Sequence, residues 1–193
     1  MALNLSSNTF NHHIRYMAST SSWSMSRTDG QNGQVPFTFT QAVIDLDNIV
    51  TGWCYIAEGE FDWVQDESLT KAAAKPMDGR DWKRGFKVKL FSKSLFGDEP
   101  VRELCTSATG AVKSIESLYG QFEKDRGLNV GKVPVVEFKG SVPLKVGKGN
   151  TTVPTLVIIK WIDRPDELYS ASNNGLLPQS SAAQSSQPSV SEF

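Results

Sequence analysis

The stretch Gly85–Lys93, with the sequence GFKVKLFSK, alternates apolar and basic side chains along its length. Successive side chains of a β-strand point to opposite faces, so Phe86, Val88 and Leu90 are expected on one face and the basic residues on the other. An apolar face of this kind packs against a core. The stretch therefore predicts a half-buried strand, and the rest of the fold is interpreted outward from it.

Further stretches have the β-branched and aromatic composition that is typical of strands. They are residues 35–44 and 49–56 before this strand, and residues 133–138 and 155–161 after it. The segment 45–48, with the sequence DLDN, is typical of a turn and predicts a long hairpin between the first two strands. Residues 57–84 are a long excursion between the second and third strands, with room for a short helix.

One helix is expected between the third and fourth strands. Its apolar residues recur at the spacing of a single helical stripe, which predicts an amphipathic helix. Thr106 or Ser107 can cap its start, and Gly127 is suited to its end. The stripe consists of Ala108, Ala111, Val112, Ile115, Leu118, Tyr119 and Phe122.

The predicted fold class is mainly β with one helix (α+β), in the order β-β-β-α-β-β. This is the order of an OB-type five-stranded Greek-key barrel, an architecture whose strand face and loops bind oligonucleotides and oligosaccharides. Other small α+β sandwiches and barrels share the order and stay as alternatives. The barrel domain is expected over residues 35–169.

Both flanking segments have polar compositions that disfavour a packed core. Residues 1–34 are rich in Ser, Asn and Thr and are expected to be a flexible arm, and residues 170–193 contain eight Ser and three Gln and are expected to be a disordered tail. The folded part is then the size of one ordinary domain.

Charge is distributed unevenly along the chain. The formal net charge is −1. Residues 35–79 carry −6, however, whereas residues 80–160 carry +7 and include the predicted third strand and the helix. A locally basic region in a neutral chain is compatible with binding to an anionic polymer that follows one face.

The basic residues of the third strand, together with nearby aromatics, are the candidate nucleic-acid-binding site. Lysines neutralise phosphates and release counterions, and aromatic rings stack on bases. Trp53 and Tyr55 share one face of the second strand and are expected either beside the lysines or in the core. The segment 139–152 is expected to be a flexible basic loop between the last two strands, with a plain soluble hairpin as the alternative. The candidate residues are Trp53, Tyr55, Lys83, Arg84, Lys87, Lys89, Phe91, Lys93, Lys139, Lys145 and Lys148.

The order of elements, the Ser/Gln/Pro-rich tail and the terminal Glu192–Phe193 resemble single-stranded-DNA-binding proteins of bacteria and their phages. The resemblance implies a chain that coats single-stranded DNA with little sequence preference in replication, recombination and repair. It also implies docking of replication or repair proteins through Glu192 and Phe193. A phage-encoded or mobile-element variant is the form that fits.

The remaining residues favour no cofactor or metal. Cys54 and Cys105 lie among apolar residues without a CxxC pattern and are expected to be buried thiols. No apolar run reaches the length of a membrane span and no secretory signal is evident, so we expect no membrane partner and a cytoplasmic location, which is the host cytoplasm for a phage protein. The sequence does not set the oligomeric state, and a homo-oligomer is compatible with it.

Two other function classes stay open. One is a protein-interaction or virion-structural β-domain, whose basic face would meet an acidic protein. The other is a Mg²⁺-dependent nuclease, because Glu137 and Lys139 fit half of a known nuclease pattern and Asp125 is at a compatible distance in the sequence for the second carboxylate. Acid-x-Lys matches are no more frequent in this chain than chance predicts, so a non-enzymatic single-stranded-DNA-binding protein is the preferred interpretation.

Overall fold

The computed structural model describes residues 12–27, 33–57, 60–147 and 149–172. These residues form a mainly β molecule with few helices, built on one open mixed sheet. This confirms the predicted mainly β class. The strands are β1 (His13–Met17), β2 (Ser22–Ser26), β3 (Gln34–Phe37), β4 (Gln41–Ile44), β5 (Val50–Ala57), β6 (Glu60–Gln65), β7 (Lys83–Phe91), β8 (Val101–Thr106), β9 (Lys132–Val146) and β10 (Gly149–Asp163).

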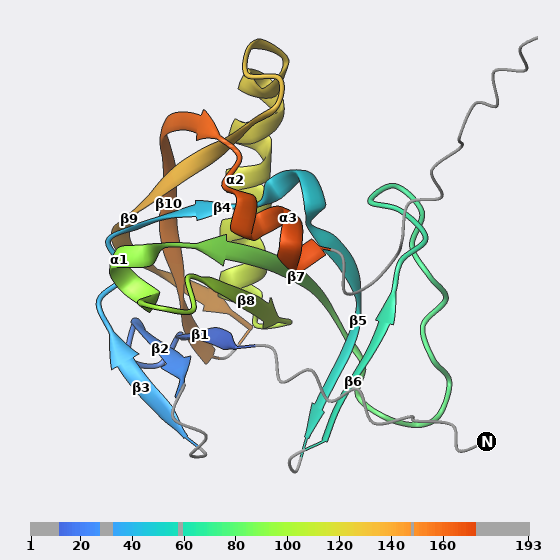
Figure 1. The fold of residues 1–193 in the computed structure, drawn as a ribbon. Coiled ribbons are helices and arrows are strands. Elements are labelled where there is room, and N and C mark those ends of the chain that lie inside the picture. The colour runs from blue at the N-terminus through green and yellow to red at the C-terminus, as the bar shows by residue number, and fades with distance from the viewer. Residues whose placement is uncertain (1–11, 28–32, 58–59, 148, 173–193) are drawn as a thin grey trace, which may run out of the picture.

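Strand β7 is the centre of the sheet (Figure 1). The strands follow the order β10-β9-β4-β7-β8-β1-β2-β3, while β5 pairs with β7 and β6. Strand β1 runs parallel to β8, and the other pairs are antiparallel. The hairpin of β5 and β6 projects away from the rest of the sheet (Figure 1).

The predicted hairpin between residues 35–44 and 49–56 is wrong. Strands β4 and β5 do not pair with each other; both pair antiparallel with β7, at Ile44 opposite Leu90 and Val50 opposite Lys87. The segment between them contains the 3-10 turn η1 (Leu46–Asn48). The chain continues in the same direction after this turn and does not reverse, so β4 and β5 lie one after the other along β7. The physical reason is burial: Asp45 is fully buried and accepts hydrogen bonds from Asn48 and from Arg164, far along the sequence.

The first predicted strand is also divided. Residues 34–37 form β3, which pairs with β2, and residues 41–44 form β4, which pairs with β7 and β9. The expectation of a flexible arm over residues 1–34 does not hold for the part that the structure describes. Ile14, Tyr16 and Trp23 of β1 and β2 are buried, so these short strands contribute apolar side chains to the core.

The expected loop over residues 139–152 is instead the outer half of a long hairpin. Strands β9 and β10 pair from Lys132 opposite Asp163 to Val146 opposite Gly149. Side chains hold this half of the hairpin against β1, because the Tyr16 hydroxyl lies 2.7 Å from both Ser141 Oγ and Thr152 Oγ1. The hairpin is therefore fixed by tertiary contacts that its Gly-rich and Lys-rich sequence does not reveal.

The predicted helix is present as α2 (Thr109–Asp125). It packs beside β10, and its stripe residues Ala111, Ile115, Leu118 and Phe122 are buried in the main core with Phe86, Val88 and Leu90 of β7. The remaining helical elements are α1 (Lys93–Phe96), the 3-10 turn η2 (Arg126–Leu128) and α3 (Asp166–Ser172). Helix α3 lies on the opposite face of the sheet, where Leu168 is buried against Val43, Val133 and Val135. It includes the first three residues of the expected tail, and the rest of the tail lies outside the described residues.

Two glycines of α2 make a matched test of this packing. A Cβ at Gly110 would lie 2.0 Å from the carbonyl oxygen of Thr152, whereas a Cβ at Gly120 meets no atom within 4 Å. We expect Gly110→Ala to lower the free energy of unfolding by about 2 kcal/mol, because the β10 backbone must shift. We expect Gly120→Ala to raise it by about 0.5–1 kcal/mol through helix propensity. Urea unfolding of both variants measures the difference, and equal effects would contradict the close packing of α2 on β10.

Candidate nucleic-acid interface

The two faces of β7 differ as its sequence predicts. Phe86, Val88 and Leu90 are at most 2% exposed and face α2, whereas Lys87 and Lys89 are half-buried on the outer face. The core side of this strand is therefore confirmed. Whether the outer face binds nucleic acid stays a prediction, and the neighbours of each basic side chain indicate which of them are available to a ligand.

Lys87 lies among aromatic rings that were not predicted to surround it. Its ammonium is 4.9 Å from the ring centroid of Trp63 and 5.1 Å from that of Phe61, both on β6. Phe61 is 49% exposed. Phe61 and Trp63 alternate with acidic residues in the segment Glu60–Gln65, and this period of two is the signal that could have identified β6 as a strand.

Lys83 and Lys89 lie on the same outer face as Lys87. Lys83 is exposed and forms an ion pair with Asp81 at 3.3 Å. Lys89 is opposite Glu103 on β8, and burial lowers the pKa of its ammonium even though Glu103 opposes that shift. We name the side chains of Phe61, Trp63, Lys83, Lys87 and Lys89 the Lys87 surface.

Trp53 and Tyr55 lie on the other face of the projecting hairpin. Trp53 pairs in register with Arg84 and not with the outer lysines, and its indole nitrogen donates to the carbonyl of Ala73 at 2.9 Å. The Tyr55 ring packs 5.9 Å from the Trp82 ring. Of the two alternatives, the position beside the outer lysines is therefore wrong, because the register puts Trp53 and Tyr55 on the opposite face from Lys83 and Lys87. The segment between β6 and β7 folds back over the two rings.

That segment is held by buried and charged contacts. Asp66 is buried and binds both guanidinium nitrogens of Arg84, the Thr51 hydroxyl and the Ala73 amide. Arg80 stacks on both Tyr55 and Trp82, at 4.8 and 4.7 Å from the ring centroids. Arg84, a candidate for phosphate binding, is thus engaged with a carboxylate.

These contacts predict an acid transition of the segment. The hydrogen bond from Arg84 holds the pKa of Asp66 well below its usual range, and hydrogen bonds from Trp82 and Arg80 lower the pKa of Asp78 to about 2, against the opposing effect of desolvation. A carboxyl group whose pKa is lowered in the folded state stabilises that state at pH values above its unfolded pKa, which is near 3.8. This stabilisation is lost as the pH falls below that value.

We expect Asp66→Asn to reduce the acid-dependent loss of stability between about pH 4 and pH 2. Tryptophan fluorescence during acid titration measures it, with Asp81→Asn as the exposed control.

Phe91 and Lys93 both contact α3. The Phe91 ring packs against the small cluster around Leu168, and Lys93 forms an ion pair with Glu167 at 2.8 Å. Lys93 begins α1 and is not part of β7. Helix α3 therefore limits access to Phe91, whereas Lys93 stays exposed and is paired with a carboxylate.

The lysines of the long hairpin lie on other strands. Lys139 on β9 pairs with Glu137 at 2.7 Å, and Lys145 is exposed near the end of β9. Strand β4 separates β9 from β7 in the sheet. Lys148, Glu192 and Phe193 lie outside the described residues, so the predictions for them remain untested.

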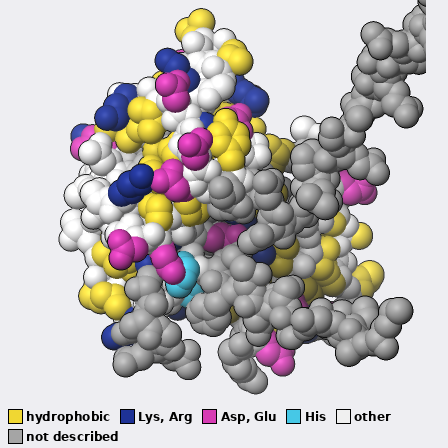
Figure 2. Space-filling model, viewed as in Figure 1, with side chains coloured by type: hydrophobic (Ala, Val, Ile, Leu, Met, Phe, Trp, Pro, Cys, Tyr) yellow, Lys and Arg dark blue, Asp and Glu magenta, His cyan; other side chains and the backbone are white. Residues whose placement is uncertain are grey.

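The face of the molecule drawn in Figure 2 has no broad basic area in its described part, because its basic side chains lie beside acidic ones. Figure 2 shows Lys and Arg side chains interspersed with acidic ones over the described part of this face. Lys83, Arg84, Lys93 and Lys139 each pair with a carboxylate, whereas the contacts recorded for Lys87 are with aromatic rings. Lys87 is therefore a candidate cation that lies beside exposed ring area, which comes from Phe61 outside the candidate set.

A groove of about 310 Å³ lies between α2 and the sheet, on the core side of β7. Its lining is mainly apolar and includes Ile49, Leu69 and Phe86, with Arg84 and Glu116 among the polar residues. It opens away from the outer face that carries Lys87. The groove and the Lys87 surface are thus separate features of the molecule.

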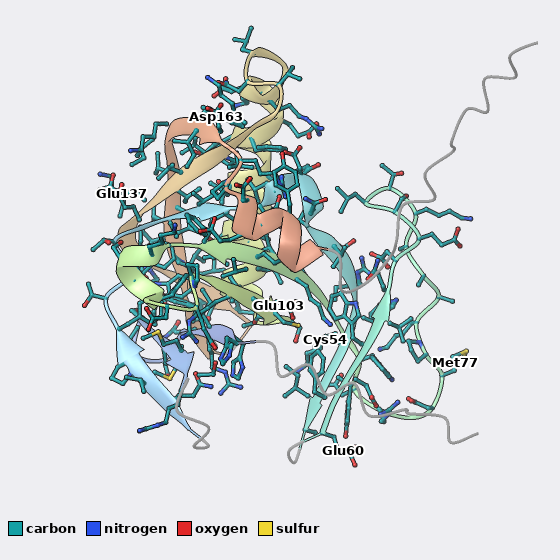
Figure 3. The ribbon with its side chains drawn as sticks, viewed as in Figure 1. Cys54, Glu60, Met77, Glu103, Glu137 and Asp163 are labelled. Atoms are coloured by element: carbon teal, nitrogen blue, oxygen red, sulfur yellow. The ribbon has the colours of Figure 1, made fainter. Side chains whose placement is uncertain are left out.

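The residues of the nuclease pattern do not form a carboxylate cluster in the described part of the chain. Glu137 is paired with Lys139 on β9, and within residues 12–172, apart from the gaps, no group of three or more His, Cys, Asp and Glu residues has metal-binding geometry. Figure 3 places Glu137 across the sheet from Cys54 and the projecting hairpin. In the same described ranges, no helix is long and apolar enough to cross a membrane.

Comparison with known proteins gave no matching family model, and neither a curated relative nor a solved structure of significant similarity.

Proposed function

We propose that the chain binds single-stranded DNA through the Lys87 surface, with little sequence preference. The observation that carries the proposal is the contact of the Lys87 ammonium with the rings of both Phe61 and Trp63 on the outer face of β5, β6 and β7. Single strands are bound without sequence readout by cations that neutralise phosphates and by rings that stack on bases. One short surface supplies both.

The mechanism is sequestration of the strand. Lys87 and Lys83 would contact phosphates, and the exposed ring of Phe61 would stack on a base with about 1–3 kcal/mol of binding free energy. Occupying the strand in this way prevents reannealing and nuclease access. The acidic residues of the excursion between β5 and β7 would keep the phosphate chain on the outer face.

We further propose that the central strands form an OB-type arrangement. We count β4 and β5 as one interrupted strand. The sheet then has the order β10-β9-β4/β5-β7-β8, and α2 lies between β8 and β9 in the sequence. This is the strand order of an OB fold. This assignment differs from the one expected from the sequence, because strands 1 and 2 become β4/β5 and β7. The excursion that carries Phe61 and Trp63 then occupies the loop between the first two barrel strands, one of the usual ligand-binding loops of the fold.

The test is a titration with oligo-dT at about 50 and about 200 mM salt, followed by quenching of tryptophan fluorescence. For a site that neutralises about two phosphates, through Lys83 and Lys87, the affinity is expected to fall about sevenfold between the two conditions. The variant Trp63→Phe should remove most of the quenching, whereas Trp82→Phe, at a buried position, should leave it. An absence of binding at the lower salt concentration would exclude the proposal.

A second function, a protein-interaction or virion-structural β-domain, is favoured by one observation. Ile56 and Phe61 are neighbours across the projecting hairpin, and each is about half exposed, at 52% and 49%. Large exposed apolar side chains on a projecting element are typical of a protein contact. Size-exclusion chromatography with the 260/280 nm absorbance ratio separates the two functions, because carried-over nucleic acid favours DNA binding.

A further inference from the structure

The sheet has three edge strands in the described part of the chain: β3, β6 and β10. The free side of an edge strand presents unpaired N–H and C=O groups, which can pair with a strand of another molecule. Proteins usually block such edges with proline, lysine, a bulge or a covering element. The three edges of this sheet differ in how far they are blocked.

Two of the edges carry blocking features. Strand β3 is four residues long and contains Pro36, which has no N–H to donate. Helix α2 occupies backbone groups of β10, because Ser114 donates to the carbonyl oxygen of Pro154 at 2.6 Å. The Gln121 amide likewise donates to the carbonyl oxygen of Leu156 at 3.2 Å. These features disfavour the addition of a further strand at β3 or β10.

Strand β6 carries none of these features. Its sequence, EFDWVQ, contains neither proline nor lysine, and its register with β5 contains no bulge. Together with β5 it forms the hairpin that projects from the sheet (Figure 1). Strand β6 is therefore the edge that is best suited to pairing with another chain.

The pairing with β5 determines which backbone groups of β6 face outward. The amide of Asp66, which follows β6, donates to the carbonyl oxygen of Thr51 at 2.9 Å. In an antiparallel pair, alternate residues bond to the partner strand, so the even-numbered residues of β6 bond to β5. The N–H and C=O groups of Phe61, Trp63 and Gln65 then point away from β5. Within the described residues, no backbone hydrogen bond reaches these outward groups.

We propose that β6 pairs antiparallel with β6 of a second copy of this chain, which gives a symmetric dimer with one continuous sheet. A two-fold axis brings the same patch of both copies together, so the strand must be complementary to itself. The edge of β6 meets this condition both in its hydrogen-bonding groups and in its charges.

One register pairs all of the outward groups. When Trp63 lies opposite Trp63 of the second copy, Phe61 lies opposite Gln65, and about six backbone hydrogen bonds join the two strands. Registers shifted by two residues in either direction make about four such bonds between the strands. Hydrogen bonding therefore favours the register that is centred on Trp63.

The same register separates like charges. Asp62 lies opposite Val64 of the second copy, whereas one of the shifted registers places Asp62 opposite itself, where two carboxylates repel. Glu60 lies opposite Asp66, and the charge of Asp66 is already balanced by Arg84. Charge and hydrogen bonding thus favour the same alignment.

This dimer joins two Lys87 surfaces. Antiparallel pairing keeps corresponding faces of the two strands on the same side of the sheet. The rings of Phe61 and Trp63 from both copies then lie in a row on the outer face, with Lys87 of each copy beside them. Each copy contributes one short strand to the contact, so we expect a weak association, with a Kd of about 10–100 µM.

Sedimentation velocity of the full chain without nucleic acid, between about 5 and 500 µM, tests the dimer. A rise from monomer to dimer without larger species is expected, because a two-fold contact is closed. Gln65→Pro removes an outward N–H and should weaken dimerisation at least about tenfold. Gln65→Ala keeps this N–H and should leave the Kd within about twofold of the wild-type value. Circular dichroism of each variant checks that the fold is kept.

Disulfide trapping tests the register. Trp63→Cys places two sulfurs across a hydrogen-bonded pair whose Cα atoms are about 5.5 Å apart, a separation that a disulfide spans. Oxidation with copper–phenanthroline should therefore link Trp63→Cys chains into a dimer at least about tenfold faster than Asp62→Cys chains. The wild-type chain, which contains Cys54 and Cys105, gives the background rate.

The proposal is overturned by a monomer throughout the concentration range, by species larger than a dimer, or by equal dimerisation of Gln65→Pro and Gln65→Ala. It is also overturned if Asp62→Cys chains are linked as fast as Trp63→Cys chains. Because no nucleic acid is present in these measurements, none of the outcomes depends on whether the chain binds DNA.

Discussion

Replacing Lys83 and Lys87 together by glutamate is expected to abolish binding of single-stranded DNA under conditions where the wild-type chain is saturated. Both side chains lie on the outer face of β7, and Lys87 contacts the rings of Phe61 and Trp63. The double substitution removes two phosphate contacts and places two carboxylates beside the strand, so the affinity should fall at least about 50-fold at low salt. Fluorescence anisotropy of a labelled oligo-dT measures the loss.

Lys89 is deliberately kept in this variant. It faces Glu103 across the strands, and Asp45 also acts on its charge, so a glutamate at this position would add a third acid to a half-buried site and weaken the fold. The matched control is Lys113→Glu with Lys124→Glu, which changes the net charge equally on exposed positions of α2. If both double variants lose affinity to the same extent, binding follows net charge and the Lys87 surface is not the site.

The largest effect on stability is expected for Asp45→Ala. Asp45 is fully buried and binds both Arg164, whose side chain is only 10% exposed, and the Asn48 amide. Removing the carboxylate leaves a buried guanidinium without its counter-charge, which costs about 3–5 kcal/mol of unfolding free energy. It also releases the chain before α3. Urea unfolding monitored by circular dichroism gives the value.

Asp47 offers a control only two residues away. Its side chain is 37% exposed and lies 3.5 Å from Arg126, so Asp47→Ala should change the free energy of unfolding by no more than about 0.5 kcal/mol. A similar loss for both variants would show that any acid-to-alanine change in residues 45–48 destabilises the fold and that the buried ion pair contributes nothing beyond this. A small loss for Asp45→Ala would show that Arg164 finds another partner.

The sequence predicted the elements whose pattern is local. The alternation of β7 identified its core face, and the apolar stripe of α2 identified the helix and the residues that it buries. Both signals depend only on the period of the backbone, 2 for a strand and about 3.6 for a helix. The burial seen in the folded molecule follows these periods, because one face of each element contacts the core along its whole length.

The elements that were mispredicted depend on distant partners. The segment DLDN has the composition of a reversing turn, yet Leu46 and Asp45 are fully buried and Asp45 pairs with a residue 119 positions away. Residues 13–26 have a polar composition, yet the rings of Tyr16 and Trp23 pack with their centroids 5.0 Å apart within the core. A local pattern carries no information on a partner of this kind, so propensity alone gave the wrong result in both places.

The candidate site was predicted in part. Lys87 and Lys89 lie on the outer face that their spacing predicts, but the rings beside Lys87 come from β6 and not from Trp53 and Tyr55. The register between β5, β6 and β7 decides which aromatic side chains share a face with the lysines. A shift of one residue in that register would exchange the two sets.

The hydroxyl contacts of Tyr16 have a consequence for the order in which the molecule forms. They join residues separated by 125 and 136 positions, and β1 pairs in parallel with β8. During synthesis, β1 and β2 therefore leave the ribosome long before the strands that complete their environment exist. Distant pairings of this kind slow folding, since loop-closure entropy is lost before the contacts repay it. The early strands would spend most of translation as exposed, aromatic-bearing chain that depends on the last strands for burial.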